Sequence, residues 1–163
     1  MADQDKEQPA AKPPNQGQFA IQKIYIKDLS FETPHSPAIF QEEWKPAVNM
    51  DLSNAATPLG DPYYEAVLSI TITVSFDDKT VYLVEVQQAG IFHIAGFPKE
   101  AVEHMLATVC PNILFPFARE VVSDLVTRAG FPQLLLAPVN FEALYQEQQK
   151  KKSVAEPTTE TKH

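Results

Sequence analysis

The strongest constraint on the fold is a nearly perfect alternation of apolar and polar side chains over residues 63–76. The even positions from Tyr64 to Phe76 are apolar, whereas most odd positions are polar: Glu65, Ser69, Thr71, Thr73 and Ser75. A period of two with many β-branched residues predicts a half-buried strand. Asp77 and Asp78 separate this strand from a second apolar segment at 79–88. The two segments therefore predict a tight β-hairpin.

Two further strands are predicted before this hairpin. A regular alternation over 19–32 places Phe19, Ile21, Tyr25, Leu29 and Phe31 on one face, and Ile24, Ile26, Asp28, Ser30 and Glu32 on the other. A shorter strand fits 47–52. The connection between these strands contains prolines and the apolar residues Ile39, Phe40 and Trp44, which is more apolar surface than a plain loop needs.

The second half of the chain has helical periodicity. Residues 98–109 and 112–129 repeat apolar side chains at intervals of three and four, and we expect Pro111 to interrupt the helix between them. Asn140 is a suitable cap for a last helix over 141–152. Four strands followed by helices predict an α+β fold in which helices cover one face of a four-stranded antiparallel sheet.

Composition divides the 163 residues into one domain and two tails. Residues 1–18 are polar and rich in proline, and 146–163 contain Val154 as their one large aliphatic residue. Neither segment has enough apolar surface to offset the entropy of ordering, so we expect a disordered N-terminal tail and a flexible C-terminal tail. The domain is then expected over 19–145.

Charge and apolar content exclude several classes of function. Acidic residues outnumber basic residues 21 to 13, and the net charge of −8 argues against binding to nucleic acid. No run approaches the roughly 18 apolar residues that a membrane span needs. The N-terminus has no apolar core of a secretory signal. A single cysteine, Cys110, excludes an internal disulfide framework. We therefore expect a cytoplasmic protein that does not insert into a membrane.

The common sequence motifs of catalysis are missing from this chain. The chain contains no GxGxxG, P-loop, GxSxG or HExxH motif, and its four histidines lack metal-ligand spacing. His104, on a predicted helix, suits a surface or an interface. Cys110 is either a nucleophile or a small packed side chain, and the following proline in an apolar stretch favours packing. We expect no enzymatic activity, no metal and no cofactor.

The aromatic side chains are more informative, with ten Phe, five Tyr and one Trp. Several apolar residues lie where no core element clearly needs them: Phe40, Trp44, Phe141, Leu144 and Tyr145. They either attach the long connection and the last helix to the core, which periodicity alone favours, or form an exposed groove for extended apolar segments of other chains. An enzyme with a pocket among these aromatics is a more distant alternative.

Two rows of strand residues also have alternative interpretations. Asp28 and Glu32 share a strand face, and so do Leu83 and Glu85. These acidic rows are either solvated or a docking surface for a basic partner. The other side of the second hairpin strand presents Tyr82, Val84, Val86 and Gln88, a row suited either to the core or to a subunit interface. Because both faces of 19–32 carry large apolar residues, we favour an oligomer.

Four long stretches of the chain together resemble one known family, the SecB protein-export chaperones. They are YIKDLSFETPHSPAIFQEEW (25–44), LVEVQQAGIFHI (83–94), CPNILFPFAREVVSDLV (110–126) and GFPQLLLAPVNFEALY (130–145). The resemblance covers about 19–145 in the expected order, and the combination of CPNILFP with LAPVNF is specific.

This resemblance implies a bacterial cytoplasmic holdase that works without ATP or a cofactor. Such a protein binds unfolded precursor proteins, keeps them translocation-competent and delivers them to the SecA motor ATPase for export through the Sec pathway. It is a homotetramer, a dimer of dimers, and each subunit is a four-stranded antiparallel sheet with helices on one side. A SecB-like chaperone for another client, such as an antitoxin, is the alternative.

The resemblance also implies roles for individual residues. The family's SecA-docking face corresponds to Asp28, Glu32, Leu83 and Glu85. Its row of inter-dimer contacts corresponds to Tyr82, Val84, Val86 and Gln88. The client groove corresponds in part to Phe40, Trp44, Phe141, Leu144 and Tyr145. The family's C-terminal tail assists SecA binding, and here the tail diverges through a run of three lysines at 150–152.

Overall fold

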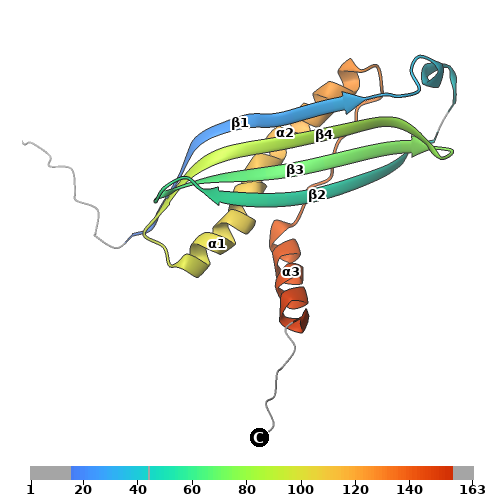
Figure 1. Ribbon diagram of the computed structural model, residues 1–163. Coiled ribbons are helices and arrows are strands. Elements are labelled where there is room, and N and C mark those ends of the chain that lie inside the picture. The colour runs from blue at the N-terminus through green and yellow to red at the C-terminus, as the bar shows by residue number, and fades with distance from the viewer. Residues whose placement is uncertain (1–15, 44, 156–163) are drawn as a thin grey trace, which may run out of the picture.

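The chain folds into one antiparallel sheet with helices behind it (Figure 1), in a computed structural model that describes residues 16–43 and 45–155. Four strands form the sheet: β1 (Gln18–Glu32), β2 (Ala47–Pro58), β3 (Tyr63–Phe76) and β4 (Lys79–Ala95). Their order across the sheet is β1-β4-β3-β2. Three helices follow, α1 (Lys99–Ala107), α2 (Val109–Arg128) and α3 (Phe141–Ala155), and a short 3₁₀ helix, η1 (Ala38–Gln41), precedes β2. The predicted α+β fold is confirmed.

The hairpin between β3 and β4 forms where the alternation predicted it. Asp77 and Asp78 both adopt positive φ angles, 50° and 59°, which matches the tight turn that the right-handed twist of two strands prefers. The strand β4 continues beyond the predicted residue 88 to Ala95, and β2 continues beyond 52 to Pro58. Small residues interrupt the apolar pattern in both extensions, and pairing with β3 keeps them extended.

Two β-bulges in β1 change which side chains share a face. The pairing with β4 shifts between Ile21 and Lys23 and again between Ile26 and Asp28. Each bulge inserts one residue, so the alternation reverses between them. Directly paired residues share a face, and one face of β1 therefore carries all of its large aliphatic residues and both phenylalanines: Phe19, Ile21, Ile24, Ile26, Leu29 and Phe31. The expectation that β1 is apolar on both faces is wrong.

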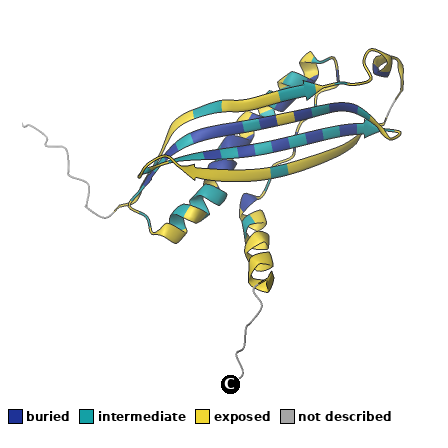
Figure 2. Cartoon of the chain, viewed as in Figure 1, coloured by how far each residue is buried: buried dark blue, intermediate teal, exposed yellow. Residues whose placement is uncertain are grey.

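The helix α2 covers the two central strands and forms the core with them. A stripe of its residues at intervals of four is buried against the sheet: Cys110, Leu114, Ala118, Val122 and Val126. Each large buried side chain stabilises the fold by about 1.5–3 kcal/mol. In Figure 2 the buried residues alternate along β3 and β4, whereas the edge strands β1 and β2 are mostly exposed. By length and composition the helical run Lys99–Arg128 would also suit a membrane span, and in this fold one stripe of its α2 part is buried against the sheet.

The break between α1 and α2 lies at Thr108 and not at Pro111, where we expected it. The Thr108 backbone leaves the helical range, at φ −126° and ψ −57°. Its hydroxyl donates a hydrogen bond to the His104 carbonyl oxygen at 2.7 Å. Pro111 lies in the first turn of α2, where a missing N–H costs no helical hydrogen bond.

The last helix begins as predicted and ends later. The Asn140 side chain accepts a hydrogen bond from the Ala143 backbone N–H at 3.0 Å, which caps α3. The helix continues to Ala155, so the first part of the expected C-terminal tail, 146–155, is helical. Of its residues only Phe141 is buried, and α3 extends away from the sheet in Figure 1. The remainder of both expected tails, 1–15 and 156–163, lies outside the described residues.

Candidate functional site

The open face of the sheet brings together the four residues predicted to dock a basic partner. Glu32 on β1 lies directly opposite Leu83 on β4, and Ser30 lies opposite Glu85. The Ser30 hydroxyl reaches the Glu85 carboxylate at 3.4 Å. Asp28 shares this face because no bulge separates it from Glu32. We refer to Asp28, Glu32, Leu83 and Glu85 as the acidic face, and its three carboxylates are exposed to solvent.

A cluster of three polar side chains beside the acidic face was not predicted from the sequence. The Tyr25 hydroxyl donates a hydrogen bond to one Glu65 carboxylate oxygen, and the Lys27 ammonium contacts the other at 2.7 Å. These contacts lower the pKa of Glu65, with the hydrogen bond from Lys27 as the main cause. Burial and the neighbouring Glu65 raise the pKa of Tyr25 to about 12. These three residues, which we call the Tyr25–Glu65–Lys27 brace, join β1 to β3 across β4. The one sign of this brace in the sequence is Glu65, the single acidic residue in a strand whose other polar side chains are hydroxyls.

The predicted row of inter-dimer contacts lies inside the single chain. Its side chains are almost completely buried, with exposed fractions of 3% for Tyr82, 0% for Val84, 1% for Val86 and 3% for Gln88. The helix α2 covers this side of β4, so in the single chain the row belongs to the core, which is one of the two alternatives that the sequence left open. Tyr82 stacks on Phe31, and the Gln88 side-chain amide donates to the Tyr25 carbonyl oxygen at 3.1 Å.

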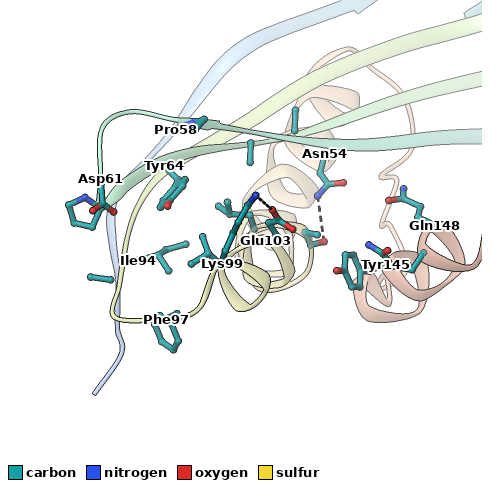
Figure 3. A pocket seen from close by; sticks show the side chains of 18 of the residues that line it. Asn54, Pro58, Asp61, Tyr64, Ile94, Phe97, Lys99, Glu103, Tyr145 and Gln148 are labelled. Atoms are coloured by element: carbon teal, nitrogen blue, oxygen red, sulfur yellow. Dashed lines mark hydrogen bonds and ion pairs between the residues drawn. The ribbon is translucent and has the colours of Figure 1, made fainter. Parts of the chain in front are cut away.

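The residues predicted for a client groove do not gather in one place. Phe40 from η1 stacks on Phe131 at 5.0 Å between ring centroids and lines a hollow of ≈ 510 Å³ with Val48 and Tyr82, which we call the aromatic hollow. Tyr145 from α3 lines a separate, larger hollow of ≈ 1020 Å³. Figure 3 shows this larger hollow, into which β2, α1 and α3 all contribute side chains.

The other predicted groove residues have different surroundings. Phe141 is buried, and its ring meets the Phe115 ring edge to face at 6.0 Å between ring centroids. Leu144 is 39% exposed. Trp44 lies outside the described residues.

The strand β2 connects the two hollows along its helix-facing side. Val48 lines the aromatic hollow, and Asn54 lines the larger one. Between them, Met50 and Leu52 point to the same side because they pair with the buried row of β3. Val48 and Met50 are 50% and 38% exposed, and Leu52 is half-buried against the core. This β2 row (Val48, Met50 and Leu52) is therefore an apolar strip that the folded chain leaves partly open. Its alternation in the sequence was short, and only the pairing with β3 showed which side it faces.

Two single residues considered for chemistry have structural partners. His104 on α1 contacts the Glu142 carboxylate on α3 at 2.8 Å, and its ring meets the Tyr145 ring edge at 5.1 Å between centroids. This contact joins α3 to α1. Cys110 is fully buried, and burial raises the pKa of its thiol to about 12. A reactive thiolate is therefore scarce at neutral pH, which agrees with a packing role.

Comparisons with known proteins agree with this architecture. A family model described as "Preprotein translocase subunit SecB" matches residues 12–152. The protein-export protein SecB of Nitrosococcus oceani is 55% identical over 157 residues, covering 95% of this chain and 96% of that protein. The corresponding protein of Methylococcus capsulatus is 54% identical over 143 residues, covering 87% and 92%.

A solved structure shows the same fold at low sequence identity. It is the Mycobacterium tuberculosis Rv1957 SecB-like chaperone in complex with a ChAD peptide from the Rv1956 HigA1 antitoxin, with a TM-score of 0.62 and 19% identity, covering 75% of this chain and 91% of that one. The fold and the matches together define a chaperone of protein export and translocation, a class of binding proteins and not of enzymes. Within that class, the chain belongs to the SecB family.

Proposed function

We propose that this chain is an ATP-independent holdase of the bacterial cytoplasm that binds unfolded precursor proteins and delivers them to the SecA motor ATPase. The observation that carries the proposal is the exposed β2 row, which runs between two hollows on the helix side of the sheet. A folded partner hides its apolar residues in its own core. An apolar strip of this length therefore suits a chain that is still unfolded.

The shape of this surface accounts for a broad choice of clients. At about 3.4 Å per residue, the strand from Val48 to Pro58 accommodates an extended segment of roughly ten residues. The segment would place side chains in the aromatic hollow beside Phe40 and in the larger hollow beside Tyr145. Because β2 is an edge strand, it also has unpaired backbone groups for an extended partner. Apolar contact and backbone pairing tolerate many sequences.

The acidic face supports the second half of the proposal, delivery to SecA. Its carboxylates lie on the face of the sheet that the helices leave open, opposite the β2 row. A partner docked there does not compete for space with a client on the helix side. Complementary charge mainly raises the rate of association and selects the partner.

We also propose the homotetrameric assembly, with contacts on surfaces other than the Tyr82 row, because that row is buried in the single chain. On β1 the helix-facing residues Ile21, Ile26 and Leu29 are between 39% and 47% exposed. The helix α1 buries none of its residues in the single chain. These apolar surfaces are available for contact between subunits.

A substitution in the β2 row tests client binding. We expect Met50→Asp to weaken affinity for an unfolded precursor by about ten-fold, because a carboxylate interrupts the apolar strip. The matched control is Asn49→Asp, which places the same charge one residue away on the open face, where Asn49 pairs with Thr73. Affinity for a denatured precursor would be measured by calorimetry in the absence of ATP, with thermal unfolding of each variant. Equal affinities for the two variants would contradict the proposal.

A further inference from the structure

Lys27 and Asp28 project on the same side of the sheet because the second β-bulge interrupts the alternation of β1. In an unbroken strand, neighbouring side chains point to opposite faces. Here Ile26 pairs with Gln88, and Asp28 pairs with Gln87, the adjacent residue of β4. Lys27 lies between Ile26 and Asp28 and has no partner residue on β4. Its ammonium reaches Glu65, which shares the open face. The bulge thus places Lys27 on the same side of the sheet as its neighbour Asp28, a carboxylate of the acidic face.

Glu65 holds this cation toward β3, two strands away from β1. The Lys27 Nζ lies 2.7 Å from one Glu65 oxygen, and the Tyr25 hydroxyl occupies the other. Tyr25 pairs with the small residue Ala89, which is fully buried and leaves room for the tyrosine ring to cross β4. The Glu65 side chain is 15% exposed and the Lys27 side chain is 46% exposed, so the carboxylate is largely shielded from solvent and the ammonium reaches it from the surface.

Asp28, in contrast, is left for other contacts. Among the described residues it takes part in no ion pair and no side-chain hydrogen bond, although Lys27 is its neighbour in the chain.

We propose that Glu65 is a positioning residue for partner docking, which keeps Lys27 away from Asp28 and so preserves the negative charge of the acidic face. The inference rests on the proposed docking of SecA to that face. When Glu65 is neutral, the Lys27 ammonium is free to pair with the carboxylate of Asp28, its neighbour in the bulged strand. The open side of the sheet then loses the charge of Glu65, and the acidic face loses, through pairing, the charge of Asp28.

The first experiment measures SecA affinity by calorimetry for full-length variants. We expect Glu65→Gln to weaken binding by about ten-fold and Glu65→Gln with Lys27→Gln to restore it to within about two-fold of wild type. Asp51→Asn is the matched control, since Asp51 is an exposed acid on the open face of β2. It removes one charge and releases no lysine, so we expect a loss of about two-fold or less. Circular dichroism confirms that each variant is folded.

The second experiment does not depend on SecA. A water-soluble carbodiimide activates a carboxylate, and an adjacent lysine amine displaces the urea to form an amide with net loss of water. In wild-type protein we expect mass spectrometry to find Lys27 joined to Glu65. In Glu65→Gln we expect Lys27 joined to Asp28.

The two experiments separate the inference from the proposed function. If wild type does not bind SecA but the cross-link moves to Asp28, the docking proposal fails and the positioning of Lys27 stands. If wild type binds SecA and Glu65→Gln is no weaker than Asp51→Asn, or if the double variant remains as weak as the single one, the positioning role is wrong. A cross-link that does not move to Asp28 also overturns it.

Discussion

At the scale of single residues, Asp28 and Glu32 lie on one strand face because the pairing between them is regular. A β-bulge lies just before Asp28, between Ile26 and Asp28. Two residues four apart on either side of that bulge would point to opposite faces of the sheet. Glu65 illustrates the opposite case, since its partners Tyr25 and Lys27 are 40 and 38 residues away in the chain. Contacts of this kind depend on register between strands, which local alternation does not contain.

The brace makes stability depend on pH in a defined direction. The pKa of Glu65 in the folded chain is lowered from its ordinary value of 4.5, so the stabilising contribution is complete above that value and is lost as pH falls through the lower folded pKa. At neutral pH we expect Glu65→Gln to reduce the free energy of unfolding by about 1 kcal/mol. Urea denaturation of both proteins from neutral to acidic pH checks this. A difference that stays constant down to strongly acidic pH would show that the carboxylate charge is not involved.

At the scale of elements, coverage by α2 decides which strand faces are available to partners. It covers β3 and β4 and leaves much of the helix-facing side of β1 and β2 exposed. The apolar rows of the inner and edge strands look alike in the sequence. Consequently the buried row of β4 belongs to the core, while the exposed row of β2 is the candidate client surface.

This arrangement predicts the outcome of a charge in the buried row. Val86 is 1% exposed. We expect Val86→Asp to destabilise the subunit by about 3–5 kcal/mol, because an unpaired carboxylate is buried beneath α2. Glu85→Lys, on the adjacent open face, should change stability by no more than about 0.5 kcal/mol. Denaturant titration with light scattering follows both unfolding and assembly. Folded dimers of Val86→Asp with unchanged unfolding would instead support a role at a subunit contact.

At the scale of the whole molecule, the sheet separates two proposed binding surfaces of different chemistry. The acidic face lies on the open side, and the β2 row lies on the helix side. Charge interactions are screened over a Debye length of about 8 Å at physiological ionic strength, whereas apolar contacts are not. The two proposed functions should therefore respond differently to salt and to mutation.

We expect SecA affinity to fall by about ten-fold or more between about 0.05 and 0.5 M NaCl, while client affinity changes by about two-fold or less. Glu85→Lys should abolish SecA binding and leave client binding intact, because Glu85 lies on the face away from the β2 row. Calorimetry on the same protein batch measures both affinities. If Glu85→Lys weakened both to the same extent, or neither, the two surfaces would not be separate.

Local pattern was sufficient for much of this protein. Alternation over 63–76, the turn at Asp77 and Asp78, and the cap at Asn140 are short-range features, because each depends on neighbours within one strand, turn or helical turn. Together with the order of elements they predicted the α+β class and the sharing of one strand face by Asp28 and Glu32. The long matching stretches predicted the family.

Long-range packing settled what local pattern left open. The bulges of β1 moved Ile24 and Ile26 to the helix-facing side, and α2 enclosed the row from Tyr82 to Gln88. Phe40 and Tyr145, which were expected in one groove, line two separate hollows because η1 and α3 lie at different parts of the molecule (Figure 1). Each of these outcomes depends on where a distant element lies. A strand's alternation reports that one face is apolar, but it does not report whether a helix, a partner or solvent covers that face.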